Sequence, residues 1–250
     1  MSSSDSYLYA LTKLPVILGP TAVFVTTALV LRYRVRTQGP FPIAAGLIKF
    51  NNSFYSVVSL WLFYAILSSR MTASYSVDSA FWMLLPTDAV GRIAFHLSKF
   101  YEYCDIFLVL ANGGQIGLHF AFHHLTTPVL TYVRVLQHYD GWELFAILNT
   151  LHHVLMYAYF GGMSAFRPIL RWTGALQLVV GILVEIRIMS IKLTDGDTLW
   201  PNMISCLLLT CYMVLFVRDI KMEDEAKKET KGNTSKEDSV NGSADRLKAD

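Results

Sequence analysis

Long apolar stretches alternate with short polar loops along most of the chain. Four stretches are plain by hydropathy, and the three between them also carry charged residues and histidines. Because a helix that crosses a bilayer needs about 20 mostly apolar residues, we predict an all-α, multi-pass integral membrane bundle of about seven transmembrane helices. The predicted spans are Pro15–Leu31, Phe54–Leu67, Ile93–Leu110, Gln115–Val133, Leu144–Gly162, Ile169–Met189 and Leu199–Val217.

The composition separates a membrane domain from a charged tail. Of 250 residues, 53% are hydrophobic and 16% are charged, against about a quarter charged in ordinary soluble domains. Residues 218–250 hold 8 of the 21 basic and 9 of the 19 acidic residues. We therefore predict a membrane domain over 1–217 and a disordered, charged, cytosolic tail over 218–250. A soluble enzyme and a nucleic-acid binder are excluded, and three irregularly spaced cysteines in apolar stretches exclude a secreted disulfide scaffold.

Basic residues in the loops indicate the orientation, because Lys and Arg are enriched on the cytosolic side. One side of the predicted bundle collects eight of them and the other six, which favours a lumenal N-terminus and a cytosolic C-terminus. The two sets are Arg32, Arg34, Arg36, Lys49, Arg167, Arg171, Arg218 and Lys221, and Lys13, Arg70, Arg92, Arg134, Arg187 and Lys192.

Three short segments carry information about targeting. Met1–Thr12 has no basic region followed by an apolar core, so no cleavable signal peptide is expected. Phe81–Leu85 is apolar but too short to span and is expected at the membrane interface. Arg246 and Lys248 nearly match the dilysine retrieval signal of membrane proteins in the endoplasmic reticulum, which functions only in the cytosol.

Three ionisable residues share one broad face of the third predicted span. Lys99, Glu102 and Asp105 are spaced i, i+3 and i+6, so each is turned by about 60° from the one before. They could form an ion-pair strip that only joins helices. Inside a membrane, however, ionisable residues usually mark a functional site.

Three histidines fall within six residues of the fourth span. His119 and His123, four residues apart, lie on one helix face, and His124 points about 100° away. A single histidine could be a packed core residue, but three make that reading improbable. Neutral imidazoles suit either metal ligation or nucleophilic and acid–base catalysis.

A polar face continues along the fifth span. Asn149, His153, Met156, Tyr157 and Phe160 follow helical spacing. Packing alone would explain the methionine and the phenylalanine. The asparagine and the histidine need polar partners once they are buried.

These clusters resemble the ELO family of fatty-acid elongases, the condensing enzymes of the endoplasmic reticulum. The family's Lys-x-x-Glu-x-x-Asp motif is matched at 99–105, and its Asn-x-x-x-His-x-x-Met-Tyr-x-Tyr motif at 149–159. A looser motif on the sixth span is matched by Thr173 and Gln177. The histidine box departs from the family pattern His-x-x-His-His, because Phe120 stands three residues before His123 and the first histidine is His119.

The resemblance implies a decarboxylative Claisen condensation of an acyl-CoA with malonyl-CoA. Imidazole can attack a thioester and form an acyl-imidazole, a role that the resemblance gives to His123 and His153. Neither a cofactor nor a metal is expected. Expected partners are the two CoA substrates, the lipid bilayer, the reductase and dehydratase of the elongation cycle, and a second copy of the chain in a homodimer.

Roles for the remaining residues also follow from the resemblance. Asn149, Tyr157 and His124 are candidate donors to the oxyanion and enolate, and Glu102 and Asp105 are expected to orient histidines. His119, the displaced first histidine of the box, is a further candidate catalytic residue. Substrate or CoA contacts are expected at Lys99, Tyr159, Gln177, Arg167 and Arg171.

Two other functions fit parts of the pattern. A membrane di-iron desaturase or hydroxylase would use a similar histidine box but needs about eight histidines in three boxes, whereas this chain has seven in all. A transporter or channel could also have a polar core. Iron content would identify the first, and decarboxylation of malonyl-CoA would exclude the second. Chain length, saturation of the acyl substrate and oligomeric state do not follow from the sequence.

Overall fold

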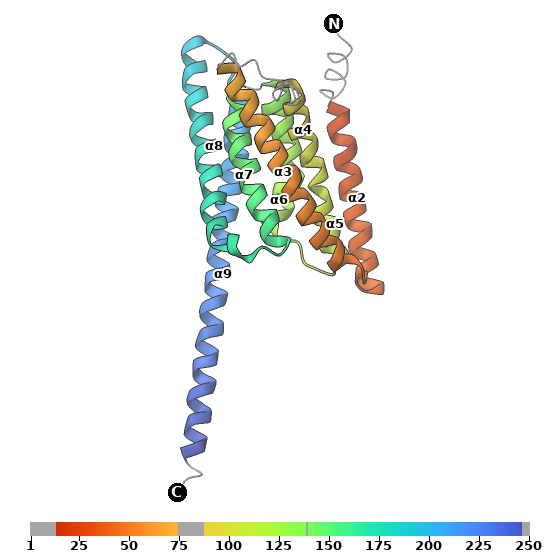
Figure 1. Ribbon diagram of the computed structural model, residues 1–250, viewed down its shortest axis with the longest axis vertical. Coiled ribbons are helices and arrows are strands. Elements are labelled where there is room, and N and C mark those ends of the chain that lie inside the picture. Colours follow the sequence, from red (N-terminus) through yellow and green to blue (C-terminus); the bar gives the residue numbers. More distant parts are fainter. Residues whose placement is uncertain (1–13, 75–87, 139, 247–250) are drawn as a thin grey trace.

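The computed structural model describes residues 14–74, 88–138 and 140–246, and they are helical with no strand among them. The all-α prediction is confirmed. The long helices lie side by side in one bundle (Figure 1). Their bounds are α2 Leu14–Gln38, α3 Ala44–Ser74, α4 Asp88–Tyr101, α5 Tyr103–Ala111, α6 Leu118–Thr131, the π-helical segment η2 Tyr132–Gln137, α7 Trp142–Phe160, the 3₁₀ turn η3 Ser164–Phe166, α8 Arg167–Asp195 and α9 Trp200–Arg246.

Four of the described helices are long and apolar enough to cross a membrane. They cover Pro15–Gln38, Ala44–Arg70, Ser164–Asp195 and Trp200–Lys228. The other three predicted spans coincide with α4–α5, α6–η2 and α7, which run beside these four (Figure 1). They are shorter or interrupted, and they carry the polar clusters. The count of seven spans therefore remains a prediction.

Four glycines between the predicted spans mark turns of the chain. Gly39, Gly113, Gly141 and Gly196 all have positive φ, which glycine adopts without steric cost. Two loops meet at one end of the bundle, where the Phe41 amide donates to the Ala111 carbonyl at 2.9 Å. We call this the tail end: α2, α5 and α7 finish there, α3, α6 and α8 begin there, and α9 extends beyond it (Figure 1).

Six consecutive helix contacts close the bundle into a ring. α3 packs on α7, α7 on α8, α8 on α9, α9 on α6, α6 on α4 and α5, and these return to α3. α2 lies outside the ring against α5. Side chains that point inward from any of these helices therefore meet in one interior, although they are up to about 160 residues apart in sequence.

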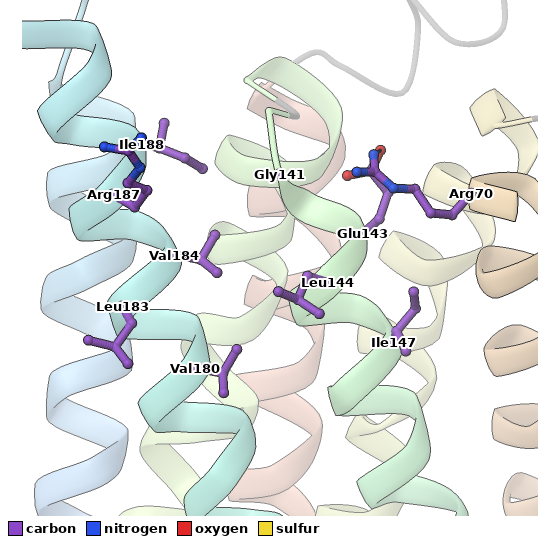
Figure 2. A pocket seen from close by; sticks show the side chains of 10 residues that line it. All are labelled: Arg70, Gly141, Glu143, Leu144, Ile147, Val180, Leu183, Val184, Arg187 and Ile188. Atoms are coloured by element: carbon purple, nitrogen blue, oxygen red, sulfur yellow. Dashed lines mark ion pairs between the residues drawn. The ribbon is translucent and has the colours of Figure 1, made fainter. Parts of the chain in front are cut away.

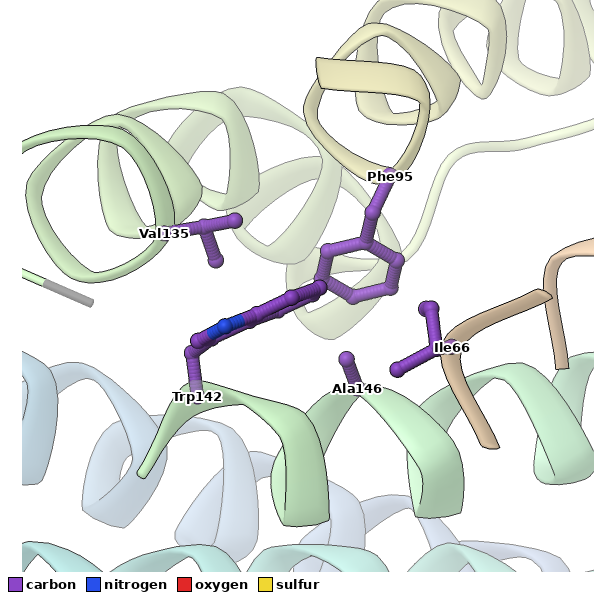
Figure 3. Close-up of a cluster of buried hydrophobic side chains, with 5 residues drawn as sticks. All are labelled: Ile66, Phe95, Val135, Trp142 and Ala146. Carbon is purple, nitrogen blue, oxygen red and sulfur yellow. The ribbon is translucent and has the colours of Figure 1, made fainter. Parts of the chain in front are cut away.

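Apolar contacts fix the ring at the end opposite the tail. Phe95 of α4 and Trp142 of α7 pack with Ile66, Val135 and Ala146, and all five are buried (Figure 3). The cluster joins α3, α4, η2 and α7. It thereby holds the helices that carry the polar residues at a fixed separation.

A buried polar cluster joins η2, α8 and α9. Arg134 donates through Nε to Glu185 at 2.9 Å, and the same carboxylate accepts from Asn202 at 2.6 Å and Ser205 at 2.7 Å. Arg134 was predicted to be a loop charge, whereas the structure buries it. Removing it from the count makes the difference in loop charge between the two sides larger.

Helix α9 continues from the membrane domain into the predicted tail. Its backbone is helical as far as Arg246, within the region 218–250 for which a disordered, charged tail was predicted. A Glu223–Lys227 ion pair at i, i+4 supports the first turns outside the bundle. Residues 1–13, Phe81–Leu85 and Lys248 lie outside the described residues, so the expectations for them stay as predictions.

The orientation of the tail is tested by its two glycosylation sequons, Asn233-Thr234-Ser235 and Asn241-Gly242-Ser243. We expect no glycosidase-sensitive mass when the protein is expressed in eukaryotic cells, because the cytosol has no access to the glycosylation machinery. A mass shift that disappears in Asn233→Gln/Asn241→Gln would place the tail in the lumen and overturn the predicted orientation.

Candidate active site

The three polar motifs converge inside the ring. The helices α3, α4, α6, α7, α8 and α9 each contribute at least one side chain, and most of these are buried. Lys99 and Glu102, with exposed fractions of 2% and 1%, are deeply buried charges. The residues concerned are Tyr55 of α3, Lys99 of α4, Glu102 between α4 and α5, His123 and His124 of α6, Asn149 and His153 of α7, Gln177 of α8 and Tyr212 of α9.

Glu102 is the hub of this cluster. Its Oε1 accepts hydrogen bonds from Lys99 Nζ at 2.7 Å and from the Tyr55 hydroxyl at 3.1 Å. His153 Nδ1 lies 3.3 Å from the same oxygen. Oε2 is buried with no hydrogen-bond partner among the described residues. Glu102 stands at the interruption between α4 and α5, where the Asp105 amide bonds to its carbonyl in an i, i+3 turn.

Asn149 links three helices. Its Oδ1 accepts from Lys99 Nζ at 2.7 Å, and its Nδ2 donates to Gln177 Oε1 at 3.0 Å. This pair of contacts fixes which way the amide faces. Nδ2 also lies 3.5 Å from His153 Nε2. The amide thus connects the lysine, the glutamine and the histidine.

His123 and His153 face each other beside the carboxylate. One ligand or proton-accepting atom from each, together with an oxygen of Glu102, lies within 4.8 Å of the others. The Glu102 contact assigns the proton of His153 to Nδ1 and leaves Nε2 with a free electron pair. The His123 ring packs against Tyr212, with centroids 4.8 Å apart. Two imidazoles and a carboxylate in this arrangement can perform nucleophilic and acid–base chemistry.

Asp105 holds a tyrosine and not a histidine. Its Oδ2 accepts a short hydrogen bond from the Tyr157 hydroxyl, and its Oδ1 accepts from Asn51 at 2.9 Å. Tyr101 donates to Asn51 at 2.7 Å in turn. The prediction that Asp105 orients a histidine is therefore wrong in this structure, whereas Glu102 does contact one.

The histidine box separates into an inner and an outer part. His124 is buried, its ring packs on Phe120 at 4.4 Å, and its Nδ1 has no hydrogen-bond partner among the described residues. His119 lies at the edge of the bundle, where Nδ1 is 3.3 Å from Asp219 of α9. The displaced first histidine thus pairs with α9 and has no contact with Glu102, although its ring lies edge-on to that of His123, with centroids 6.1 Å apart.

This separation predicts unequal effects of two alanine substitutions. We expect His124→Ala to lower the proposed condensation activity about a hundredfold or more, the usual cost of a preplaced donor. His119→Ala should leave activity within about threefold of wild type, because a part-exposed ion pair contributes little. The initial rate of condensation, measured on variants with the same thermal stability, gives both effects. Equally severe losses in the two variants would mean that His119 is a catalytic residue.

The residues predicted to contact CoA have three different positions. Lys99 is inside the cluster, where it bonds to Glu102 and Asn149. Arg167 and Arg171 lie at the tail end and pair with Glu223, Arg171 at 3.0 Å. Tyr159 is turned about 200° from Tyr157 on α7. Its ring contacts that of Phe160.

Tyr55, Asn51 and Tyr212 were missed by the sequence analysis. Asn51 and Tyr55 are four residues apart on α3, so their spacing could have indicated a polar face in the second span. Nothing in the sequence distinguishes Tyr212 from the apolar residues around it.

A divalent metal ion is poorly matched to this cluster. Glu102, His123 and His153 could each supply one ligand atom. Lys99 Nζ, however, already lies 2.7 Å from the carboxylate, and its positive charge repels a cation.

Two further histidines that a di-iron site would need have other partners. His96 is hydrogen-bonded to Thr131 and His152 to Thr173, each at 2.8 Å. The described histidines therefore do not form the three boxes of a desaturase.

Comparison with known proteins identifies the family. The matching family is described as "ELO: GNS1/SUR4 family", over residues 9–219. The chain is 31% identical to "Very long chain fatty acid elongase 1" of Homo sapiens over 60% of its own length and 58% of that protein's. It is 29% identical to "Very long chain fatty acid elongase 7" of Rattus norvegicus, over 74% and 70% respectively.

A third relative, "Very long chain fatty acid elongase 5" of Mus musculus, is 26% identical over 67% of this chain and 58% of its own. The chain thus spans less than two thirds of the length of several of the relatives it matches. No solved structure matches it. The match to the family profile covers most of the chain, including all three polar motifs, and the chain belongs to the ELO family.

Proposed function

We propose that this protein is a fatty-acid elongase that condenses an acyl-CoA with malonyl-CoA to give a 3-ketoacyl-CoA, CO₂ and CoA. The observation that carries the proposal is the pair formed by the part-buried His123 and the buried His153 beside Glu102, inside a ring of helices. The names of the relatives support the same class of activity. A cysteine nucleophile, which soluble condensing enzymes use, is not favoured. Cys104 is not among the residues grouped with Glu102, His123 and His153.

In the first step one imidazole of the pair attacks the acyl thioester. A C–N bond forms, the C–S bond breaks, and CoA leaves as a thiolate that takes a proton from solution. When His153 is the nucleophile, its Nδ1 proton passes to Glu102, which lies 3.3 Å away. The result is an acyl-imidazole, a reactive acyl donor.

In the second step malonyl-CoA loses CO₂ and its enolate carbon attacks the acyl group. A C–C bond forms, the C–N bond breaks, and the imidazole recovers its proton. The tetrahedral oxyanion needs a donor already in place. Of the three predicted donors, Asn149 donates to Gln177 and Tyr157 to Asp105. His124, whose Nδ1 is without a partner in the described structure, is therefore the best candidate.

Lys99 has a positioning role in this scheme. Its ammonium group bonds to both Glu102 and Asn149, so it fixes the carboxylate and the amide on either side of His153. It also compensates the buried negative charge, which would otherwise be costly to desolvate. CoA phosphates would be met nearer the tail end, where Arg167 and Arg171 lie.

The setting of the enzyme is also proposed. The apolar helices support a membrane protein. Membership of the elongase family favours the endoplasmic reticulum, and the basic residues in the loops favour a tail in the cytosol. The reductase and dehydratase that complete an elongation cycle are the proposed partners, and a homodimer is the proposed assembly.

The test is an assay of the purified protein with malonyl-CoA labelled in its free carboxyl group and a ladder of acyl-CoA lengths. We expect labelled CO₂ and one equivalent of 3-ketoacyl-CoA, both dependent on the acyl-CoA. Release of CO₂ without ketoacyl product, or no release with any acyl-CoA, would contradict the proposal. Stoichiometric iron with loss of two hydrogens from the acyl chain would indicate the desaturase instead.

A further inference from the structure

A groove of about 480 Å³ lies between α7 and α8 on the outer face of the ring (Figure 2). Leu144 and Ile147 form its wall on α7, and Val180 and Val184 form its wall on α8. Leu183, beside the latter two, is 59% exposed. In a membrane this surface faces lipid, so the groove is open to the hydrocarbon region and suits an extended apolar chain.

Charged groups gather at only one end of the groove, the end opposite the tail. Arg187 of α8 lies on one side of Gly141, and Arg70 with Glu143 lies on the other (Figure 2). Arg70 and Glu143 form an ion pair at 3.6 Å. The Arg187 side chain is exposed and makes no hydrogen bond or ion pair with the described residues. Two arginines and one glutamate leave this rim with a net positive charge.

The position of the rim matches the depth of lipid headgroups. Arg70 lies four residues before the end of α3 at Ser74, and Arg187 lies beside Gly141, at the beginning of α7 (Figure 2), so the apolar walls extend from this end toward the bilayer centre. Basic side chains at such positions reach toward the interface, where phosphates are their natural counter-ions.

We propose that this groove binds a glycerophospholipid with a net negative headgroup. Its phosphate would contact Arg187 and Arg70, and one acyl chain would lie between α7 and α8. The occupant must join an apolar chain to an anion at the membrane surface, which a free phosphate or a soluble metabolite does not. A zwitterionic lipid would fit the walls but would not match the net charge of the rim. Binding would join the helix that carries Asn149 and His153 to the helix that carries Gln177.

The test is native mass spectrometry of the detergent-purified full chain with equal amounts of phosphatidylglycerol and phosphatidylcholine. We expect preferential retention of phosphatidylglycerol and about a fivefold loss of that preference in Arg187→Gln, the effect of one basic residue near a lipid surface. Arg36→Gln is the matched control, because Arg36 is an exposed arginine of α2 at the tail end. Inorganic phosphate at the same concentration should not compete.

Three outcomes would overturn the proposal. They are equal retention of both lipids by the wild type, an equal loss of preference in Arg187→Gln and Arg36→Gln, and full competition by inorganic phosphate. A second variant, Val180→Trp, fills the apolar half of the groove and leaves the charges in place. It should lower retention of phosphatidylglycerol while condensation activity and thermal stability stay measurable.

Discussion

His123→Ala and His153→Ala are each expected to lower formation of 3-ketoacyl-CoA by about a thousandfold or more, the usual scale for removal of a nucleophile or its base. The two imidazoles lie within 4.8 Å of each other and of Glu102, so neither can replace the other without a change in geometry. Product formation by purified protein measures the effect. Thermal unfolding should change little compared with the activity.

His96→Gln is the matched control for this pair. His96 is more deeply buried than either, with an exposed fraction of 1%, and its hydrogen bond to Thr131 can be kept by glutamine. Its rate should stay within about threefold of wild type, because it touches no group placed in the mechanism. Near-normal activity in either alanine variant would remove the nucleophile assignment.

Lys99→Met is expected to lower both stability and activity. Methionine fills similar space but leaves the Glu102 carboxylate buried without its cation, and breaking a buried ion pair costs up to about 3–5 kcal/mol. Loss of the hydrogen bond to Asn149 should also disturb the amide beside His153. We expect a lower melting temperature in detergent and a fall in activity of about a hundredfold or more.

The double variant Lys99→Met/Glu102→Gln separates the two effects. It removes both charges, so most of the lost stability should return while activity stays low, because the partner of His153 has lost its charge. Arg171→Gln, which breaks an exposed ion pair with α9, should leave the melting temperature almost unchanged. Recovery of activity in the double variant would mean that Lys99 and Glu102 are only structural.

The spacing of residues along single helices predicted much of the site. The i, i+3 spacing of Lys99 and Glu102 made an ion pair between them possible, and helical periodicity placed Asn149 and His153 on one face. The same geometry explains why Asp105 departs from its prediction. A further turn of about 60° directs it away from the histidines and toward Tyr157.

Contacts between distant helices were not predictable from local spacing. His119 pairs with Asp219, a hundred residues later in the sequence. Arg134 is buried because it donates a hydrogen bond to Glu185 of another helix. Tyr55 enters the cluster through the closure of the ring. The sequence therefore indicates which residues share one face of a helix, whereas the packing of the helices into a ring determines which of these faces lie against one another.

The central claim is that one of the two histidines beside Glu102, His123 or His153, carries the acyl group. The most direct measurement is rapid-quench intact-mass and peptide mapping after mixing the protein with an acyl-CoA and no malonyl-CoA. The account predicts release of up to one equivalent of CoA and one acyl mass on His123 or His153, removed when malonyl-CoA is added. Release of CoA only in the presence of malonyl-CoA, or an acyl group on Cys104, would contradict it.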